Sequence, residues 1–302
     1  MRAFAWFLLL LAVALGVVAV FSYPAWLLLH PHFDFPFHRI GERLGMLALA
    51  AGFVLVARRL KLADRASLGY GAPRPLFVRE LLIGLALGVA TMLAVVAAMS
   101  ALGLLDWSRA AAMGAGALAQ LSIARLLSGL TVALIEETFV RGAMYSAIER
   151  ESGARTAILL TSLLYAATHF FAKARIAPED VTAWSGVALL GQSLQAFAHF
   201  AGIVDAFLAL TAVGVVLALV RRATGNIAAC LGLHAGWVWV MLVAHELSAP
   251  RRDAPLGFLL SRFDGFVGWL VLAWTVVLAV PLWRFYTARG AAIARKTFSG
   301  TP

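Results

Sequence analysis

Residues 81–105 read LLIGLALGVATMLAVVAAMSALGLL, a run without a charged side chain. A membrane-crossing helix needs about 20 mostly apolar residues, because a helix rises about 1.5 Å per residue and the hydrocarbon core of a bilayer is about 30 Å thick. This run is therefore long enough to cross a membrane as a helix. The same measure finds seven further apolar runs, at residues 3–29, 44–57, 125–147, 155–171, 203–220, 226–244 and 265–284.

The composition of the whole chain agrees with a membrane protein. Of the 302 residues, 62% are hydrophobic and 13% are charged, and the mean hydropathy is +0.89. Soluble globular proteins contain about 45–50% apolar and about 25% charged residues, so this composition excludes a water-soluble protein. The sequence predicts an all-α, polytopic membrane helical bundle of about eight transmembrane helices, with residues 1–302 forming a single integral membrane domain.

The distribution of basic residues predicts the orientation of the bundle, because Lys and Arg are enriched in cytoplasmic loops. With eight spans, fifteen Lys and Arg residues fall on the side that holds both termini, and eight fall on the other side. Both termini are therefore predicted to be cytoplasmic. The net charge of +10 reflects these loops rather than nucleic-acid binding. We expect the basic loop at 58–80 only to set the topology and to contact anionic lipid headgroups.

Several functional classes lack support in the sequence. The single cysteine, Cys230, excludes an intrachain disulfide and a Cys-rich metal motif. The chain has no phosphate-binding Gly loop, so we expect neither nucleotide nor nucleic-acid partners, and it has no internal repeat of the kind that transporters contain. A composition rich in Ala, Leu, Val and Arg indicates a bacterial gene. The predicted location is the bacterial inner membrane, with the lipid bilayer and a membrane peptide or protein substrate as partners.

Ionisable side chains within the predicted spans are few. Each costs about 2.5–3.5 kcal/mol at the centre of a membrane helix, so each is a candidate for a functional role. The residues are Glu136, Glu137, Arg141, His169, Asp205 and His234. Glu137 and Arg141 are spaced i,i+4, which predicts an ion pair, whereas Glu136 points about 100° away and is left unpaired. An unpaired carboxylate in a low-dielectric site is suited to act as a general base.

These residues have a simpler interpretation, in which the acids and Arg141 only hold helices together by buried pairing. That interpretation explains one Glu–Arg pair well. It does not explain two adjacent acids, an arginine and two histidines on further helices, so we favour a functional site. Asp205, near the start of its span, is expected to be a solvated helix start.

Three short motifs on successive predicted helices resemble those of a known family. Residues 136–141 read EETFVR, which fits EExxxR; residues 165–169 read YAATH, which resembles FxxxH; and residues 233–237 read LHAGW, which resembles the start of an HxxxN-type motif. Together they are similar to the CPBP family of intramembrane proteases, the CAAX-protease and bacteriocin-processing group also called Abi. The resemblance covers about residues 126–244, a CPBP-like catalytic core.

The rest of the chain is matched to the family only by its expected topology: N-terminal helices at 1–105, and a final helix with a basic tail at 265–302. The resemblance implies an endopeptidase similar to type II CAAX prenyl proteases, which hydrolyses peptide bonds of membrane-associated substrates. In eukaryotic relatives these substrates are prenylated C-terminal tails. In a bacterium, peptide processing or bacteriocin self-immunity is the corresponding expectation.

The resemblance also implies roles for individual residues. Glu136 and His169 would activate the attacking water, and His234 would help to hold the oxyanion of the tetrahedral intermediate. Glu137 and Arg141 would position the helix and Glu136. Peptide hydrolysis needs such parts: a base for water, a proton donor for the leaving amine, and donors where negative charge develops.

The sequence departs from the family pattern at two positions. Val238 stands where the third motif usually has Asn, and Val238 has no donor group. The only asparagine, Asn226, lies about 12 Å lower on the same predicted helix. Either Trp237, through its indole N–H, or a backbone N–H would then replace the missing donor, or activity is weak. Tyr165 replaces Phe, and its hydroxyl either orients His169 or simply packs.

The sequence leaves the cofactor and the activity open. Glu136, His169 and His234 could form the His₂Glu ligand set of a catalytic zinc, with a water as fourth ligand, so the expected cofactor is none or Zn. We favour the metal-free form, because a buried Glu with two His already supplies a base, an acid and an oxyanion donor. An alternative function is a non-proteolytic membrane scaffold or chaperone, which Val238 favours. A proton-coupled transporter using Glu136 and His234 is a weaker third hypothesis.

Overall fold

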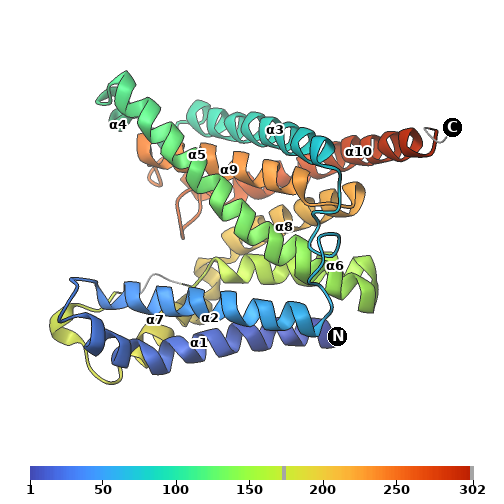
Figure 1. Cartoon of the computed structure of the whole chain (residues 1–302). Coiled ribbons are helices and arrows are strands. Elements are labelled where there is room, and N and C mark those ends of the chain that lie inside the picture. The colour runs from blue at the N-terminus through green and yellow to red at the C-terminus, as the bar shows by residue number, and fades with distance from the viewer. Residues whose placement is uncertain (172–174, 300–302) are drawn as a thin grey trace.

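The chain folds as a bundle of helices, described by a computed structural model for residues 1–171 and 175–299 (Figure 1). The α-helices of this part are α1 (Arg2–Leu29), α2 (Phe37–Arg59), α3 (Arg74–Ala101), α4 (Ser108–Ala111), α5 (Ala115–Glu137), α6 (Tyr145–Thr168), α7 (Ser185–Ala198), α8 (Val204–Thr224), α9 (Ala228–Leu247) and α10 (Trp269–Ser299). A π-helix, η1 (Thr138–Met144), joins α5 to α6, and two short strands, β1 (Leu105–Asp106) and β2 (Ala249–Pro250), pair in antiparallel fashion. Three short 3₁₀ helices are η2 (Pro178–Asp180), η3 (Phe200–Gly202) and η4 (Gly257–Leu259). The prediction of an all-α polytopic bundle is confirmed.

Seven helical segments of the described chain are long and apolar enough to cross a membrane. One of them, Ala115–Thr168, contains 54 residues, which would extend about 80 Å as one helix and exceed the thickness of a bilayer. Gly153 interrupts this segment with a φ of 82°. Since the helix breaks there, the segment corresponds to two of the eight predicted crossings, those at 125–147 and 155–171.

The ends of the chain agree with an even number of crossings. In Figure 1 the N-terminus and the last turns of α10 lie at the same end of the bundle. The second predicted span, 44–57, was the shortest, and in the structure α2 extends back to Phe37 and includes Glu42 and Arg43. Which end of the bundle faces the cytoplasm stays a prediction.

Helices α3 and α9 pack at very short range because each presents glycines to the other's backbone. Gly84 and Gly88 lie one turn apart on α3, and Gly232 and Gly236 lie one turn apart on α9. A Cβ on Gly232 would lie 2.1 Å from the carbonyl oxygen of Leu81, and the other three glycines likewise face backbone atoms of the opposite helix. Small residues four apart allow such close approach between membrane helices, where packing replaces the hydrophobic driving force.

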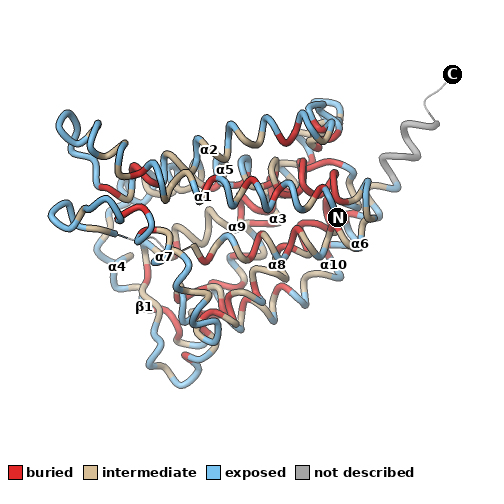
Figure 2. The backbone as a smooth tube through the Cα atoms, turned by 90° about the horizontal axis from the view of Figure 1, so that it is seen from below, coloured by how far each residue is buried: buried red, intermediate tan, exposed pale blue. Residues whose placement is uncertain are grey.

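The centre of the bundle is the first half of α9. Every residue from Ala228 to Gly236 is buried, and α9 packs against α3 on one side and α5 on another. In Figure 2 buried residues lie toward the inside of the bundle, and the outer faces of the surrounding helices are exposed. Large apolar side chains are exposed on these outer faces, for example Leu8 of α1 and Leu127 of α5. A lipid environment accounts for their exposure.

The region after the second motif contains α7, which packs against α1; residues 172–174 of this region lie outside the described residues. Asp205 opens α8 but is only 5% exposed, so the expectation of a solvated helix start is wrong. The start of α8 is covered by other parts of the protein rather than by water.

The close approach of α3 and α9 predicts that larger side chains destabilise the fold. We expect Gly232→Leu to lower the free energy of unfolding by about 1–3 kcal/mol or more, because its Cβ meets backbone that cannot move aside. Thermal unfolding of the purified protein in detergent measures this change.

A matched substitution is Gly16→Leu on α1, where a Cβ meets nothing within 4 Å. Because leucine is the better helix former, this variant should be unchanged or slightly stabilised. Equal unfolding temperatures for the two variants would contradict the packing argument.

Candidate active site

The first motif lies where the regular helix ends. Glu136 and Glu137 are the last residues of α5, and the next seven form the π-helix η1. The sequence predicted one regular helix over 125–147, so the π-helical turn is a correction to that expectation. In a π-helix hydrogen bonds run from i to i+5, and such turns occur frequently at functional sites. The wider turn changes the direction in which the following side chains point.

Glu137 and Arg141 form the ion pair predicted from their spacing. Nη1 of Arg141 donates to Oε1 of Glu137 at 2.9 Å, and both side chains are fully buried. Nη2 of Arg141 also donates to the carbonyl oxygen of Gly214 on α8 at 3.3 Å. The guanidinium carbon lies 4.4 Å from the ring centroid of Tyr165 on α6. Arg141 therefore links η1 to α6 and α8.

Glu137 also holds His234, a contact that the sequence did not reveal. Nδ1 of His234 lies 2.8 Å from Oε1 of Glu137, and the imidazole is 3% exposed. The carboxylate accepts a hydrogen bond, so Nδ1 carries the proton in this contact. The other ring nitrogen, Nε2, lies 3.9 Å from Oε2 of Glu136. A carboxylate that fixes one nitrogen of an imidazole sets the orientation of the ring and the direction of the other nitrogen.

Glu136 has a different environment from its neighbour. Its side chain is 32% exposed, and Oε2 is buried without a hydrogen-bond partner among the described residues. The prediction that Glu136 is left without a fixed cation while Glu137 is paired agrees with these contacts. Glu136 is therefore the carboxylate of this pair that is free to act on another molecule.

His169 lies at the end of α6, next to the ring of Tyr165. Its Nδ1 is 2.7 Å from the carbonyl oxygen of Tyr165, and the two ring centroids are 4.6 Å apart. The Tyr165 ring also meets His234 edge-on, at 5.9 Å between centroids. Of the two roles expected for Tyr165, ring packing is the one that these contacts describe. The tyrosine ring thus contacts both histidines.

The donor expected from Trp237 is already used. Its indole N–H donates to the hydroxyl of Thr91 on α3 at 2.9 Å, and Thr91 donates in turn to the carbonyl of Leu87. Trp237 therefore binds α9 to α3 and does not offer its N–H to a substrate in this arrangement. Asn226 is used as well, because its Oδ1 accepts the backbone N–H of Ala228 at 2.9 Å and so caps the start of α9.

The predicted zinc ligands do not form a three-ligand set here. Glu136 and His234 face one another, but the part of the chain that the structure describes contains no group of three His, Cys, Asp or Glu side chains placed to hold a metal. The contacts of His169 are with the carbonyl oxygen and the ring of Tyr165, and within the described part of the chain they join it to neither Glu136 nor His234. The residues in this arrangement do not fit a His₂Glu zinc centre, so no step below passes through a metal.

The loop between α2 and α3 lies against the site, contrary to the expectation that it only sets topology. The hydroxyl of Tyr70 is 2.5 Å from that of Thr138 in η1, and a Cβ on Gly142 would lie 2.6 Å from a carbonyl oxygen of the loop. The N–H of Ile227 donates to the carbonyl of Gly69 at 3.0 Å. The loop therefore contacts both η1 and the start of α9. In the sequence, the only signal of this contact was Tyr70, an aromatic residue within a basic loop.

This loop is itself held by hydrogen bonds. The backbone N–H and the hydroxyl of Ser67 donate to the carboxylate of Asp64, and Arg150 donates to the hydroxyl of Ser67. These bonds, with the Ser67 hydroxyl contributing most, lower the pKa of Asp64. Because the folded pKa is the lower one, the stabilisation is present above the unfolded pKa and is lost as the pH falls through the folded pKa.

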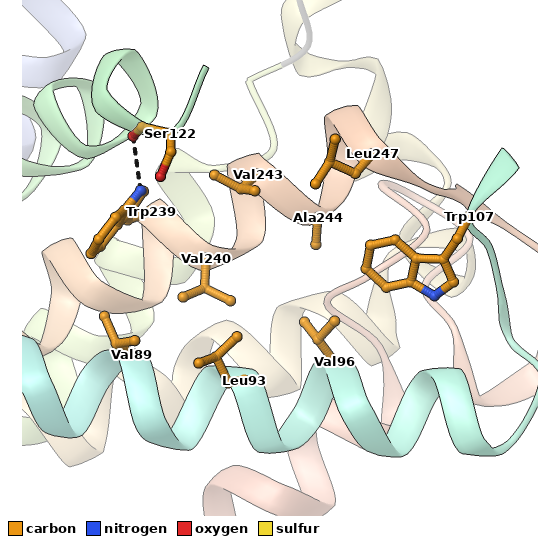
Figure 3. Close-up of a pocket in the computed structure, with 10 residues that line it drawn as sticks. All are labelled: Val89, Leu93, Val96, Trp107, Ser122, Trp239, Val240, Val243, Ala244 and Leu247. Atoms are coloured by element: carbon orange, nitrogen blue, oxygen red, sulfur yellow. Dashed lines mark hydrogen bonds between the residues drawn. The ribbon is translucent and has the colours of Figure 1, made fainter. Parts of the chain in front are cut away.

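A separate cavity of about 340 Å³ lies between α3, α5 and α9 (Figure 3). Its walls are mainly apolar, with Leu93 and Val96 from α3 and Val243 and Leu247 from α9, and none of the candidate site residues lines it. At one end the indole N–H of Trp239 donates to a carbonyl oxygen of α5 at 2.9 Å. The cavity therefore lies farther along α9 than the ionisable cluster.

The fold and the cluster define a class of protein: a polytopic membrane protein with acids, an arginine and histidines gathered between its helices. Residues 118–240 match the family model described as "Type II CAAX prenyl endopeptidase Rce1-like", and all three motifs fall inside this match. By this match, the part of the chain from 118 to 240, less than half of its length, is similar to the CAAX-protease family. No curated protein and no solved structure matches the chain.

The burial of the pair Glu137–Arg141 predicts that it contributes more to the free energy of unfolding than an exposed ion pair does. We expect Arg141→Met to lower the free energy of unfolding by about 3–5 kcal/mol, because it leaves the carboxylate of Glu137 buried beside an imidazole alone. Chemical or thermal unfolding in detergent measures the loss.

The exposed pair between Arg125 and Glu246 serves for comparison, since these side chains are 34% and 47% exposed. Arg125→Met should cost less than about 1 kcal/mol. Comparable losses at the two arginines would mean that burial does not determine the contribution of the pair.

Proposed function

We propose that the protein is an intramembrane endopeptidase that hydrolyses peptide bonds of membrane-associated substrates with an activated water. The observation that carries this proposal is the division between the two adjacent acids. Glu137 is fully buried and bound by Arg141 and His234, whereas Glu136 is 32% exposed and, among the described residues, has no hydrogen bond to its Oε2, which lies 3.9 Å from Nε2 of His234. A structural role alone would leave no reason for a second, unpaired acid at this depth.

In the proposed reaction the carboxylate of Glu136 accepts a proton as a water oxygen attacks the scissile carbonyl carbon. His169 assists through Nε2, because its Nδ1 is directed at a backbone carbonyl. The protonated Glu136 then gives its proton to the amine nitrogen as the C–N bond breaks. A base that becomes the acid in this way returns the site to its starting state at the end of the cycle.

His234 is proposed to stabilise the oxyanion. Its Nδ1–H is held by the carboxylate of Glu137, which fixes the ring so that Nε2, when it carries a proton, can donate to developing negative charge. Arg141 holds the carboxylate of Glu137 in position. The ion pair of Glu137 and Arg141 is thus proposed to position two other side chains, His234 and Glu136.

The substrate is proposed to be a hydrophobic or lipid-linked peptide presented from the bilayer. The description of the matched family, a prenyl endopeptidase, supports a membrane-associated peptide. For this chain we propose peptide processing or bacteriocin self-immunity in the bacterial inner membrane, with both termini in the cytoplasm. The long apolar helices of the bundle support a location within the lipid bilayer.

A non-proteolytic scaffold or chaperone is the second candidate. Val238 has no donor, and the indole N–H of Trp237 is bound to Thr91. A site with fewer oxyanion donors would be slow, by about 10²–10³ for each missing donor. A protein that has kept the fold and lost efficient turnover would combine these features.

The decisive test is Glu136→Gln. We expect this variant to lose about 10²–10⁴ in kcat on a membrane peptide library, because the amide cannot accept a proton from water, while its unfolding temperature stays the same. New peptide termini, followed by mass spectrometry with and without a chelator, measure the cleavage.

The exposed Glu246 offers the same chemical change away from the site, and Glu246→Gln should cleave like the wild type. Cleavage by Glu136→Gln at the wild-type rate would remove Glu136 from the reaction. If neither protein cleaves while both are folded, the scaffold function replaces the protease.

Val238→Asn is expected to raise kcat, by up to about 10²-fold, since it supplies an amide donor one turn after His234. Initial rates of peptide cleavage measure the effect. Val240→Asn, two residues further on the same helix and in the wall of the apolar cavity, should not accelerate the reaction. Equal rates for Val238→Asn and the wild type would show that the missing donor is supplied elsewhere.

A further inference from the structure

Arg221 is a buried cation that the proposed reaction does not use. It lies in the last turn of α8 and is 7% exposed, whereas its neighbour Arg222 is exposed. Among the ion pairs of the described residues, none involves Arg221. Burying a guanidinium without a carboxylate is costly unless hydrogen bonds compensate. The contacts of Arg221 should therefore show what its burial achieves.

All of these contacts fall on the π-helix and the turn that follows it. Nε donates to the backbone carbonyl of Arg141 at 3.0 Å, and Nη2 donates to the hydroxyl of Ser146 at 3.3 Å. The guanidinium carbon lies 5.6 Å from the ring centroid of Tyr145. One side chain from α8 thus covers the junction between η1 and α6.

The π-helix explains why this carbonyl needs a donor. In an α-helix the N–H of Tyr145 would bond to the carbonyl of Arg141, four residues earlier. Here that N–H bonds to the carbonyls of Val140 and Gly142 instead and passes over Arg141. Nε of Arg221 supplies a donor to the carbonyl that is passed over, so it favours the π-helical turn over a regular one.

The contact is reciprocal. Arg141 donates from η1 to the carbonyl of Gly214 on α8, and Arg221, two turns later on α8, donates to the carbonyl of Arg141. Two arginine side chains therefore bind the two segments to each other's backbone. The turn that they hold carries Arg141, whose side chain holds Glu137, and Glu137 in turn holds His234.

We propose that Arg221 is a positioning residue of the site: by binding the carbonyl of Arg141 it holds the π-helical turn, and with it the separation between the carboxylate of Glu136 and the imidazole of His234. The inference rests on the proposed protease function for its kinetic consequence. Its structural consequence, a turn held by Arg221, does not depend on that function.

The test compares Arg221→Gln with Arg222→Gln, the same chemical change at the exposed neighbour. For Arg221→Gln we expect kcat to fall by about 100-fold with KM nearly unchanged, because a misplacement of reacting groups by about 1 Å has an effect of this size. Arg222→Gln should keep the wild-type kcat and KM. Initial rates against peptide concentration give both constants.

A second readout does not depend on activity. Hydrogen exchange of residues 138–146, followed by mass spectrometry, should be faster in Arg221→Gln than in the wild type and unchanged in Arg222→Gln. If the wild type does not cleave, the proposed function fails while this comparison still tests the role of Arg221. If the wild type cleaves and both Gln variants match it in kcat and exchange, the inference is overturned.

Arg221→Lys covers the case in which Arg221→Gln does not fold. Lysine keeps the charge but lacks the planar group whose Nε and Nη2 reach Arg141 and Ser146 together. A folded Arg221→Lys protein with lowered kcat and unchanged KM supports the positioning role. Full activity in this variant would show that only the charge matters, and it would overturn the geometric role.

Discussion

The structure of the site depends on the burial of one carboxylate, that of Glu137. In the apolar interior an ionised acid must be compensated, and a single oxygen of Glu137 meets both Arg141 and His234. Arg141 extends the same network to Gly214 on α8 and to the ring of Tyr165 on α6. Removing any one partner would leave a charge without compensation, so η1, α6, α8 and α9 hold one another in place.

Close packing makes this network attainable. Hydrogen bonds between helices need backbones near one another, and the glycines of α3 and α9 allow a separation that any larger side chain would prevent. The same packing buries the half of α9 that carries His234 and fixes how deep the imidazole lies. The donor bond from Trp237 to Thr91 secures α9 to α3 in a fixed rotation. Packing and polar contacts therefore support each other, and neither would place His234 alone.

The two adjacent acids differ in environment because they differ in rotation about the helix. Glu137 faces the interior, is fully buried and is bound by Arg141 and His234; Glu136 is 32% exposed and lies 3.9 Å from Nε2 of His234. The change from α-helix to π-helix immediately after Glu137 alters the rotation per residue and so the directions of the side chains that follow, Arg141 among them.

The sequence by itself determined the helices, the approximate span boundaries, the i,i+4 pair of Glu137 and Arg141 and the unpaired Glu136, because hydropathy and helical spacing are local properties of the chain. The tertiary structure alone decided the bond between Glu137 and His234, the commitment of Trp237 to Thr91, the π-helical turn and the place of Arg221 against it. The glycine pairs on α3 and α9 were visible in the sequence, but only packing shows that they face each other. These features depend on how the helices rotate and approach one another, which a one-dimensional pattern of polarity does not specify.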